Sequence, residues 1–505
     1  MIDALQAAFS GMFGCPCMFD IFPQRLAFLL LGASIGLIVG AIPGLGGLVG
    51  LALILPFTLE MDGFSAVVLA IGLLSTLNTS DTIPAVLFAV PGTNAAQATV
   101  MDGYPMAKNG LAARALGAAY MASMMGGLFG AVVLAVSVPL LRPIVLSFGS
   151  PEFFILGMLG ISMVAVLSGN APLRGLIVAM IGLAAGMVGA DPQIGVLRWT
   201  GGQLYLFDGL PLIPIALGLF AVPEMVDLLI SGRRRLSDGG MIDRSTTMVG
   251  IKDAFRNWFL VIRCSAIGVW IGAIPGLGGA VVDWLAYGHA LQTEKGASET
   301  FGTGDVRGVI APESANNAKE GGALIPTIAF GVPGSAAMAL LLTIFLMKGI
   351  VPGPAMLTTN LDVTYTLVWG IAIANIFGTM IVLLLGNKLA RVADVSPQLL
   401  APFVIAVVMV AALQATQNVG DMLVAAVVGV MGWFMKRLAI PRPPLLLAFI
   451  LSPILENYFF ISTSRYGASW LGRPIVVTVI IMIAVSIGYA IWVQRRAKGG
   501  PNVAA

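Results

Sequence analysis

Seven stretches of this chain contain no Asp, Glu, Lys, Arg or His, and each is long enough to cross a bilayer. They are Leu26–Leu59, Ala115–Leu141, Phe153–Leu173, Gly321–Met347, Val363–Asn387, Val395–Gly420 and Pro474–Gln494. A spanning helix needs about 20 predominantly apolar residues. The apolar runs are continuous, whereas the strands of a membrane barrel alternate. The sequence therefore predicts an all-α polytopic membrane protein with about 10–12 transmembrane helices, since a helix satisfies its own backbone hydrogen bonds in lipid.

Composition and charge agree with a membrane location. Of the 505 residues, 58% are hydrophobic and only 10% are charged, whereas soluble proteins carry about 25% charged residues. The net charge of +3 is too small to indicate nucleic-acid binding. Basic residues cluster at Arg233–Arg235 and at Arg495–Lys498. Because positive residues favour the cytoplasmic side, we expect residues 231–255 and the C-terminus in the cytoplasm, and the N-terminus can lie outside.

The octapeptide GAIPGLGG occurs twice, at Gly40–Gly47 and at Gly272–Gly279. A second block follows each copy, because IPAVLFAVPGT at Ile83–Thr93 matches IPTIAFGVPGS at Ile325–Ser335. A repeat of this kind indicates an internal duplication. Transporters often carry such duplications as inverted repeats, and the charge asymmetry between the starts of the two copies favours inversion here.

A third match is shorter. MDG at Met101–Gly103 resembles MKG at Met347–Gly349, which would align Lys348 with Asp102. The sequence thus divides into a first repeat half at 1–230, a linker at 231–255 and a second repeat half at 256–505.

Each half contains two Pro-Gly breaks in apolar surroundings. Pro removes a helix donor, and Gly lets the backbone approach a ligand closely. Non-helical backbone at membrane depth survives only against protein or a water-filled cavity. Breaks that recur in register therefore favour a binding site over simple packing. The candidate residues are Pro43, Gly44, Pro91, Gly92 and Thr93 in the first half, and Pro275, Gly276, Pro333, Gly334 and Ser335 in the second.

Polar segments stand next to these breaks. Asn78, Thr79, Ser80 and Asp81 lie between apolar segments, and Asn316 and Asn317 occupy the corresponding place in the second half. Intramembrane polar groups are costly and mark ion or substrate pathways. Hydroxyl, amide and carboxylate groups suit Na⁺ or a substrate carboxylate, so we expect the elements near 75–100 and 316–345 to meet at mid-membrane. The alternative is that each segment is a solvated loop.

Two other function classes have weaker support in the sequence. Gly302–Asp305 resembles the GxGD motif of intramembrane aspartyl proteases, but it lies in a polar loop and no partner aspartate is evident. A channel-like or scaffold protein without coupled transport is a second alternative. No GxxxxGK[ST] phosphate-binding loop is present, and we expect no enzymatic activity.

The motifs resemble the large membrane subunit of tripartite tricarboxylate transporters. GAIPGLGG, the NTSDTIP segment and VPGTNAAQATVMDGYPMAKNGLAARAL at Val90–Leu116 are similar to one signature of that family. PESANNAKEGGALIPTIAFGVPGS at Pro312–Ser335 is similar to the other. The resemblance extends over nearly the whole chain.

The resemblance implies a permease of the bacterial inner membrane that imports a carboxylate. Its expected partners are a small four-helix membrane subunit and a periplasmic solute-binding protein. A sodium or proton gradient would drive uptake without ATP, and no cofactor other than the coupling ion is expected. The choice among citrate, other di- and tricarboxylates and aromatic acids is left open.

Overall fold

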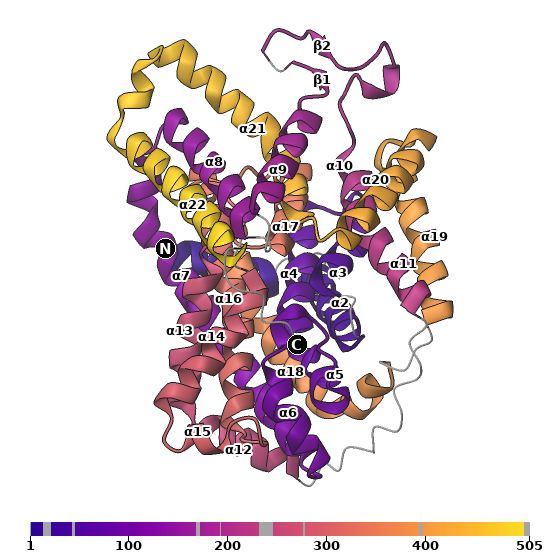
Figure 1. Ribbon diagram of the computed structural model, residues 1–505, viewed down its shortest axis with the longest axis vertical. Coiled ribbons are helices and arrows are strands. Elements are labelled where there is room, and N and C mark those ends of the chain that lie inside the picture. Colours follow the sequence, from indigo (N-terminus) through magenta and orange to yellow (C-terminus); the bar gives the residue numbers. More distant parts are fainter. Residues whose placement is uncertain are drawn as a thin grey trace.

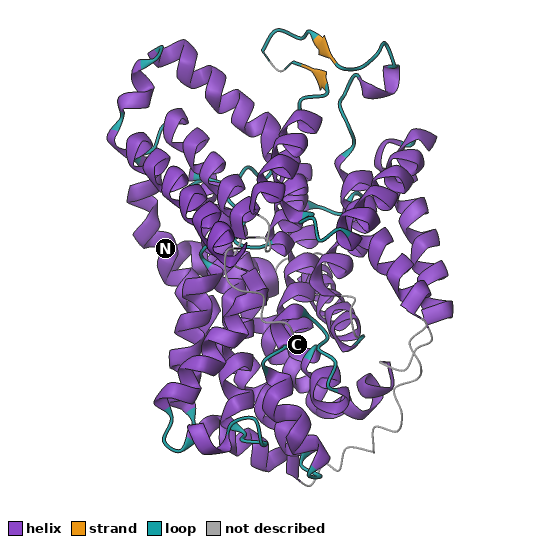
Figure 2. Ribbon diagram, in the orientation of Figure 1, coloured by secondary structure: helices purple, strands orange, loops and turns teal. Residues whose placement is uncertain are grey.

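The fold is almost wholly helical wherever the chain is described (Figure 2). The computed structural model describes residues 2–13, 22–42, 46–167, 172–191, 193–231, 246–275, 278–392 and 397–498. Within these ranges the only strands are β1 (Gly189–Ala190) and β2 (Leu197–Arg198), which pair antiparallel. The expectation of an all-α protein is confirmed. The break residues Pro43, Gly44 and Gly276, and residues 232–245 of the linker, lie outside the described residues.

The helices of the first half are α1 (Ile2–Phe13), α2 (Phe22–Ala41), α3 (Gly46–Ile54), η1 (Leu55–Thr58), α4 (Gly63–Ser80), α5 (Thr82–Phe88), η2 (Asn94–Ala96), α6 (Thr99–Lys108), α7 (Ala112–Leu146), α8 (Ser150–Leu167), α9 (Pro172–Gly186), η3 (Leu204–Leu206), α10 (Leu212–Ala216), η4 (Leu217–Ala221) and α11 (Val222–Ser231). Helix α12 (Thr247–Arg256) lies in the predicted linker, apart from its last residue. The helices of the second half are α13 (Trp258–Gly272), α14 (Gly278–Thr293), α15 (Ala297–Thr300), α16 (Arg307–Phe330), α17 (Ala336–Met347), η6 (Pro354–Leu357), α18 (Leu361–Val392), α19 (Pro397–Thr416), α20 (Val419–Arg437), α21 (Pro443–Tyr466), η7 (Ser469–Gly472) and α22 (Pro474–Lys498).

Several of these helices are suited to a bilayer. Among the described residues, six helices are long and apolar enough to cross a membrane, and a seventh span results if α12 and α13, bent by 75°, are counted together. Six further apolar helices have 10–17 residues. The chain is therefore a polytopic helical membrane protein. The total of about 10–12 spans stays a prediction, because the shorter helices fall below the roughly 20 residues of a full crossing.

The two copies of the octapeptide end helices that pack in the same way. A Cβ atom added to Gly40 would lie 2.3 Å from the carbonyl oxygen of Leu77, and one added to Gly272 would lie 2.4 Å from that of Lys319. The α2–α4 and α13–α16 pairs therefore approach backbone to backbone at equivalent points, and only glycine fits there. These repeated glycines are part of the helix-packing surface of both halves.

Helices α4 and α16 cross in the middle of the molecule (Figure 1). Their contacts pair later residues of α4 with earlier residues of α16: Asn78 with Glu320, Thr79 with Asn317 and Asp81 with Asn316. The order of these contacts means that the two helices run in opposite directions. Each is the equivalent of the other in the repeat, so the crossing joins the two halves.

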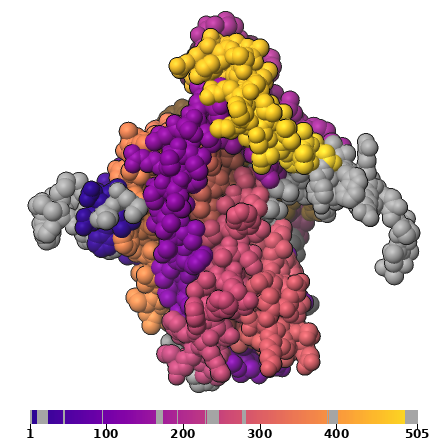
Figure 3. Space-filling view, turned by 90° about the vertical axis from the view of Figure 1, so that its left-hand side faces the viewer, coloured from indigo at the N-terminus to yellow at the C-terminus, as the bar shows by residue number. Residues whose placement is uncertain are grey.

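Each half also supplies a long helix that covers the crossing helix of the other half. Helix α7 lies along α16, where Gly126 faces the carbonyl of Ser314. Helix α18 lies along α4, where Gly378 faces the methyl group of Thr76. In Figure 3, α7 runs along the surface beside the pink helices of the second half. The halves are thus interlocked around the centre.

The third sequence match does not mark equivalent positions. Asp102 lies in the first turn of α6, whereas Lys348 is the C-cap of α17. The turns after the two helices instead align Gly110 with Gly349, both with positive φ (76° and 68°). The Lys348 Nζ donates 2.8 Å to the Leu59 carbonyl and also to the Met61 carbonyl. Lys348 therefore anchors a helix end, and the three-residue match was too short to fix the alignment.

The remaining helices form two groups beside the centre. Helices α8, α21 and α22 lie to the upper left in Figure 1 with α9 at the upper centre, and α10, α11, α19 and α20 lie to the right. The segment with β1 and β2 stands at the upper end and is held by Arg198, whose Nη1 lies 2.5 Å from the Glu456 carboxylate.

Candidate functional site

The first break, at Pro91-Gly92-Thr93, turns back against the end of α4. Helix α5 ends at Ala89 in the left-handed conformation (φ 54°). A Cβ at Gly92 would lie 2.5 Å from the Gly40 carbonyl oxygen and 2.7 Å from Asp81 Cα. Thr93 donates its hydroxyl to Asp81 Oδ2 at 2.5 Å. The break thus brings a backbone turn and a hydroxyl onto one buried carboxylate.

The second break, at Pro333-Gly334-Ser335, has the same backbone geometry without the carboxylate. Helix α16 ends at Gly331 (φ 68°). A Cβ at Gly334 would lie 2.6 Å from the Gly272 carbonyl oxygen and 2.7 Å from Ala323 Cα. Ala323 stands where the first half has Asp81, and Ser335 instead caps α17 by accepting the Met338 N–H. The two breaks have the same backbone geometry, but only the first lies against a carboxylate.

The predicted polar segments lie inside helices, so the solvated-loop alternative is wrong. Asn78, Thr79 and Ser80 belong to α4, and Asp81 stands between α4 and α5. Asn316 and Asn317 belong to α16. All six are at most 4% exposed. Burial of this kind is retained only where the polar groups have partners or a ligand.

The crossing brings most of these predicted residues together. Asn78 Nδ2 donates to Glu320 Oε1 (2.8 Å), and Asn317 Nδ2 donates to Thr79 Oγ1 (3.0 Å) and to Asn375 Oδ1 (2.7 Å). Asn316 Nδ2 lies 3.5 Å from Asp81 Oδ2. The predicted Ser80 does not join them, because its hydroxyl faces the Gly36 and Leu77 carbonyls. Pro275 lies three residues after the end of α13.

Several further polar residues of the same site were not among the predicted site residues. Lys319 and Glu320 lie on α16 between the predicted asparagines and the break, and Asn375 comes from α18. Glu313 lies one turn before Asn317 and accepts hydroxyl hydrogen bonds from Thr99 (2.6 Å) and Ser123 (2.9 Å). The sequence did contain a signal for three of them, because Glu313, Lys319 and Glu320 are the only charged residues between Arg307 and Lys348. No spacing rule would have placed Asn375.

Several oxygen atoms at the crossing are buried and have no hydrogen-bond partner. In the described chain they include Asp81 Oδ1, Asn317 Oδ1 and Glu320 Oε2. The amide nitrogens of Asn78, Asn316 and Asn317 are all used. Oxygen acceptors without donors are the ligands that hard cations prefer. These oxygen atoms are therefore of the kind that could serve as ligands of a cation such as Na⁺. Across the described ranges, no group of three or more His, Cys, Asp or Glu could hold a metal ion.

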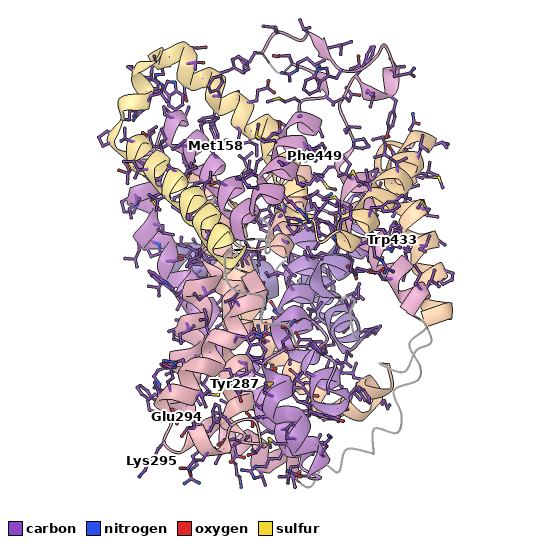
Figure 4. The ribbon with its side chains drawn as sticks, viewed as in Figure 1. Met158, Tyr287, Glu294, Lys295, Trp433 and Phe449 are labelled. Carbon is purple, nitrogen blue, oxygen red and sulfur yellow. The ribbon has the colours of Figure 1, made fainter. Side chains whose placement is uncertain are left out.

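The GxGD-like loop has a structural explanation. Asp102 Oδ1 accepts the N–H groups of Gly302, Gly304 and Asp305, each at 2.9 Å, and Tyr287 donates to Asp102 Oδ2 at 2.9 Å. Positive φ values at the two glycines (82° and 112°) let the loop wrap around the carboxylate. Tyr287 lies on α14 above Glu294 and Lys295 (Figure 4). Asp102 therefore clamps the second half to the first.

Asp305 is an ion-pair residue of this loop. Its carboxylate lies 2.7 Å from Arg307 Nη2 and accepts the Thr300 hydroxyl at 2.6 Å. Partial burial opposes ionisation, but the hydrogen bonds from Arg307 and Thr300 hold the pKa of Asp305 below its usual value. A catalytic aspartate dyad instead shares a proton and needs one raised pKa. The geometry gives no support to the protease alternative.

Comparisons with known proteins identify the family. Residues 26–447 match the model of the tripartite tricarboxylate transporter TctA family. An Agrobacterium vitis protein named "Uncharacterized 52.8 kDa protein in TAR-I ttuC' 3'region" is 30% identical over 450 residues, which is 86% of either chain. A second A. vitis protein, "Uncharacterized protein in TAR-II ttuC' 3'region", is 30% identical over 195 residues, 38% of this chain and 78% of its own length. No solved structure matches. The chain belongs to the tripartite tricarboxylate transporter TctA family.

Proposed function

We propose that the chain is the large permease subunit of a binding-protein-dependent secondary transporter that imports a carboxylate. The family supports a transport role within a system of several subunits. The crossing of α4 and α16 is the observation that carries the finer proposal. There both halves contribute buried amides, hydroxyls and carboxylates beside two backbone breaks, and several oxygen atoms are free to accept a cation.

The proposed coupling ion is Na⁺ or a proton, and its proposed ligands centre on Asp81. The Asp81 side chain is fully buried, one of its oxygens is unpaired, and Thr93 and Asn316 hold the other. An isolated buried carboxylate is unstable as an anion, so a bound cation would stabilise it there. The first break, which holds Asp81, would then carry the ion, and the second would not.

We also propose that the two halves are inverted repeats in the inner membrane. The opposed directions of α4 and α16 support this, as do those of α7 and α18, where Asn375 approaches Gly127 and Thr379 donates to the Tyr120 carbonyl. The proposed topology places the linker and the C-terminus in the cytoplasm and the N-terminus outside. The proposed partners are a small four-helix membrane subunit and a periplasmic solute-binding protein.

The test is solute uptake by cells that express all three subunits, with a panel of radiolabelled succinate, citrate and benzoate. Uptake is expected only with the binding protein present and only while a sodium or proton gradient is maintained. Uptake that persists after both gradients collapse would favour the channel-like alternative. A control strain that lacks only this chain sets the background.

A further inference from the structure

The centre of the protein contains far more negative than positive groups. Asp81, Asp283, Glu313 and Glu320 are buried there, and Asp81, Asp283 and Glu320 lie close enough to Lys319 to interact with it electrostatically. Lys319 is the only lysine or arginine that is buried in the described part of the chain. An organic anion that enters this region therefore has one fixed protein cation to bind.

The Lys319 ammonium group has one hydrogen-bond acceptor and one more distant carboxylate beside it. It donates to Asn316 Oδ1, and the nearest carboxylate oxygen, Glu320 Oε1, lies 3.5 Å from Nζ. Adjacent residues on a helix do not face each other, which explains the long contact. An ammonium has three donors, so Lys319 can accept a further anionic partner without losing Asn316.

Glu320 is held independently of Lys319. Its Oε1 accepts the Asn78 amide from the opposite half at 2.8 Å, and Oε2 has no hydrogen-bond partner. The Glu320 carboxylate would therefore remain anchored if another carboxylate replaced it beside the ammonium. Both side chains are 7% exposed, in contrast to the fully buried Asp81 and Glu313.

We infer that Lys319 binds a carboxylate group of the transported anion, and that Glu320 competes with that carboxylate for the ammonium in the empty protein. This rests on the proposed function, since it takes the solute to be a carboxylate. The transported anion and the coupling cation would then bind to different residues of the α4–α16 crossing. Lys319 holds the solute, and the unpaired oxygens around Asp81 hold the coupling ion.

The two residues should respond in opposite directions to neutralisation. Lys319→Met removes the anion partner and should weaken binding by at least about tenfold, the value of one buried hydrogen bond to a charged group. Glu320→Gln keeps an acceptor for Asn78 and removes the competitor, so it should tighten binding. Lys319→Arg retains the positive charge and should bind more tightly than Lys319→Met.

The experiment measures thermal stabilisation of the purified full-length chain by succinate and citrate in sodium-containing buffer, with succinamide as the uncharged control. Lys295→Met, a change at an exposed lysine, is the matched control and should behave as the unmodified chain. The double variant Lys319→Met/Glu320→Gln removes both charges of this pair together, so it should fold and still fail to bind.

Three results would overturn the inference. If Lys319→Met or the double variant binds with unchanged affinity, Lys319 is not the anion partner. If Glu320→Gln weakens binding as much as Lys319→Met does, the pair is a structural unit rather than a competing one. If neither acid stabilises the unmodified chain, the proposed carboxylate function fails, and this inference fails with it.

Discussion

Asp102 gives a sharp test of how the two halves are held together. Its carboxylate is fully buried and accepts three backbone N–H groups at 2.9 Å and the Tyr287 hydroxyl at 2.9 Å. Asp102→Ala would leave all four donors without this acceptor. Each unmade bond costs about 1 kcal/mol when water can partly replace it, and more when it cannot. Because the loop is only partly buried, we expect a loss of about 3–4 kcal/mol.

Thermal unfolding of the purified chain in detergent, followed by intrinsic fluorescence, measures this loss. Asp102→Ala should lower Tm by several degrees, and limited proteolysis should cut the 296–307 loop first. Asp208→Ala, at an exposed loop aspartate, is the control and should leave Tm unchanged. An Asp102→Ala protein with the stability and proteolytic pattern of the unmodified chain would refute the clamp.

Three further predictions follow from the same structure. Gly92→Val and Gly334→Val should abolish uptake and leave membrane insertion intact, because each Cβ would lie within 2.8 Å of neighbouring backbone. Gly488 faces open space, so the control variant Gly488→Val should transport normally in the same uptake assay. Cysteine accessibility should find 231–255 on the cytoplasmic side and the N-terminus outside. Finding the starts of both repeats on one side of the membrane would contradict inversion. The pKa of Asp305 is lower in the folded protein than in the unfolded chain, where it is about 4. The ionised Asp305 carboxylate therefore stabilises its loop above about pH 4, and this stabilisation is lost as the pH falls toward the folded pKa. Hydrogen exchange in the loop should rise on acidification, and unchanged exchange would exclude this role.

Much of the architecture could be predicted from local pattern. Uncharged runs predicted helices in a membrane, and the repeated octapeptide located the glycines that bring α2 to α4 and α13 to α16. The polar segments were correctly singled out as buried features, because an unpaired polar group between apolar stretches is costly whatever the fold.

The rest depended on contacts between distant segments. Ser80 belongs to the predicted segment, yet its hydroxyl faces α2, because a helix turns successive side chains by about 100°. Glu320 is the partner of Asn78 only because α4 and α16 cross in opposite directions. Asp102 contacts a loop 200 residues later. These three contacts could not be predicted from the spacing of residues along the sequence.

The central claim is that the α4–α16 crossing, rather than the charged loop at 294–307, binds the transported species. Asn78→Ala, Thr79→Ala and Asp81→Ala should each shift the half-saturating concentration of sodium or solute in uptake, by about tenfold for the loss of one buried ligand. Glu294→Ala and Lys295→Ala should not. Uptake measured against sodium and solute concentration in these five variants decides the matter. Unchanged curves for the first three variants, with shifted curves for the last two, would contradict the account.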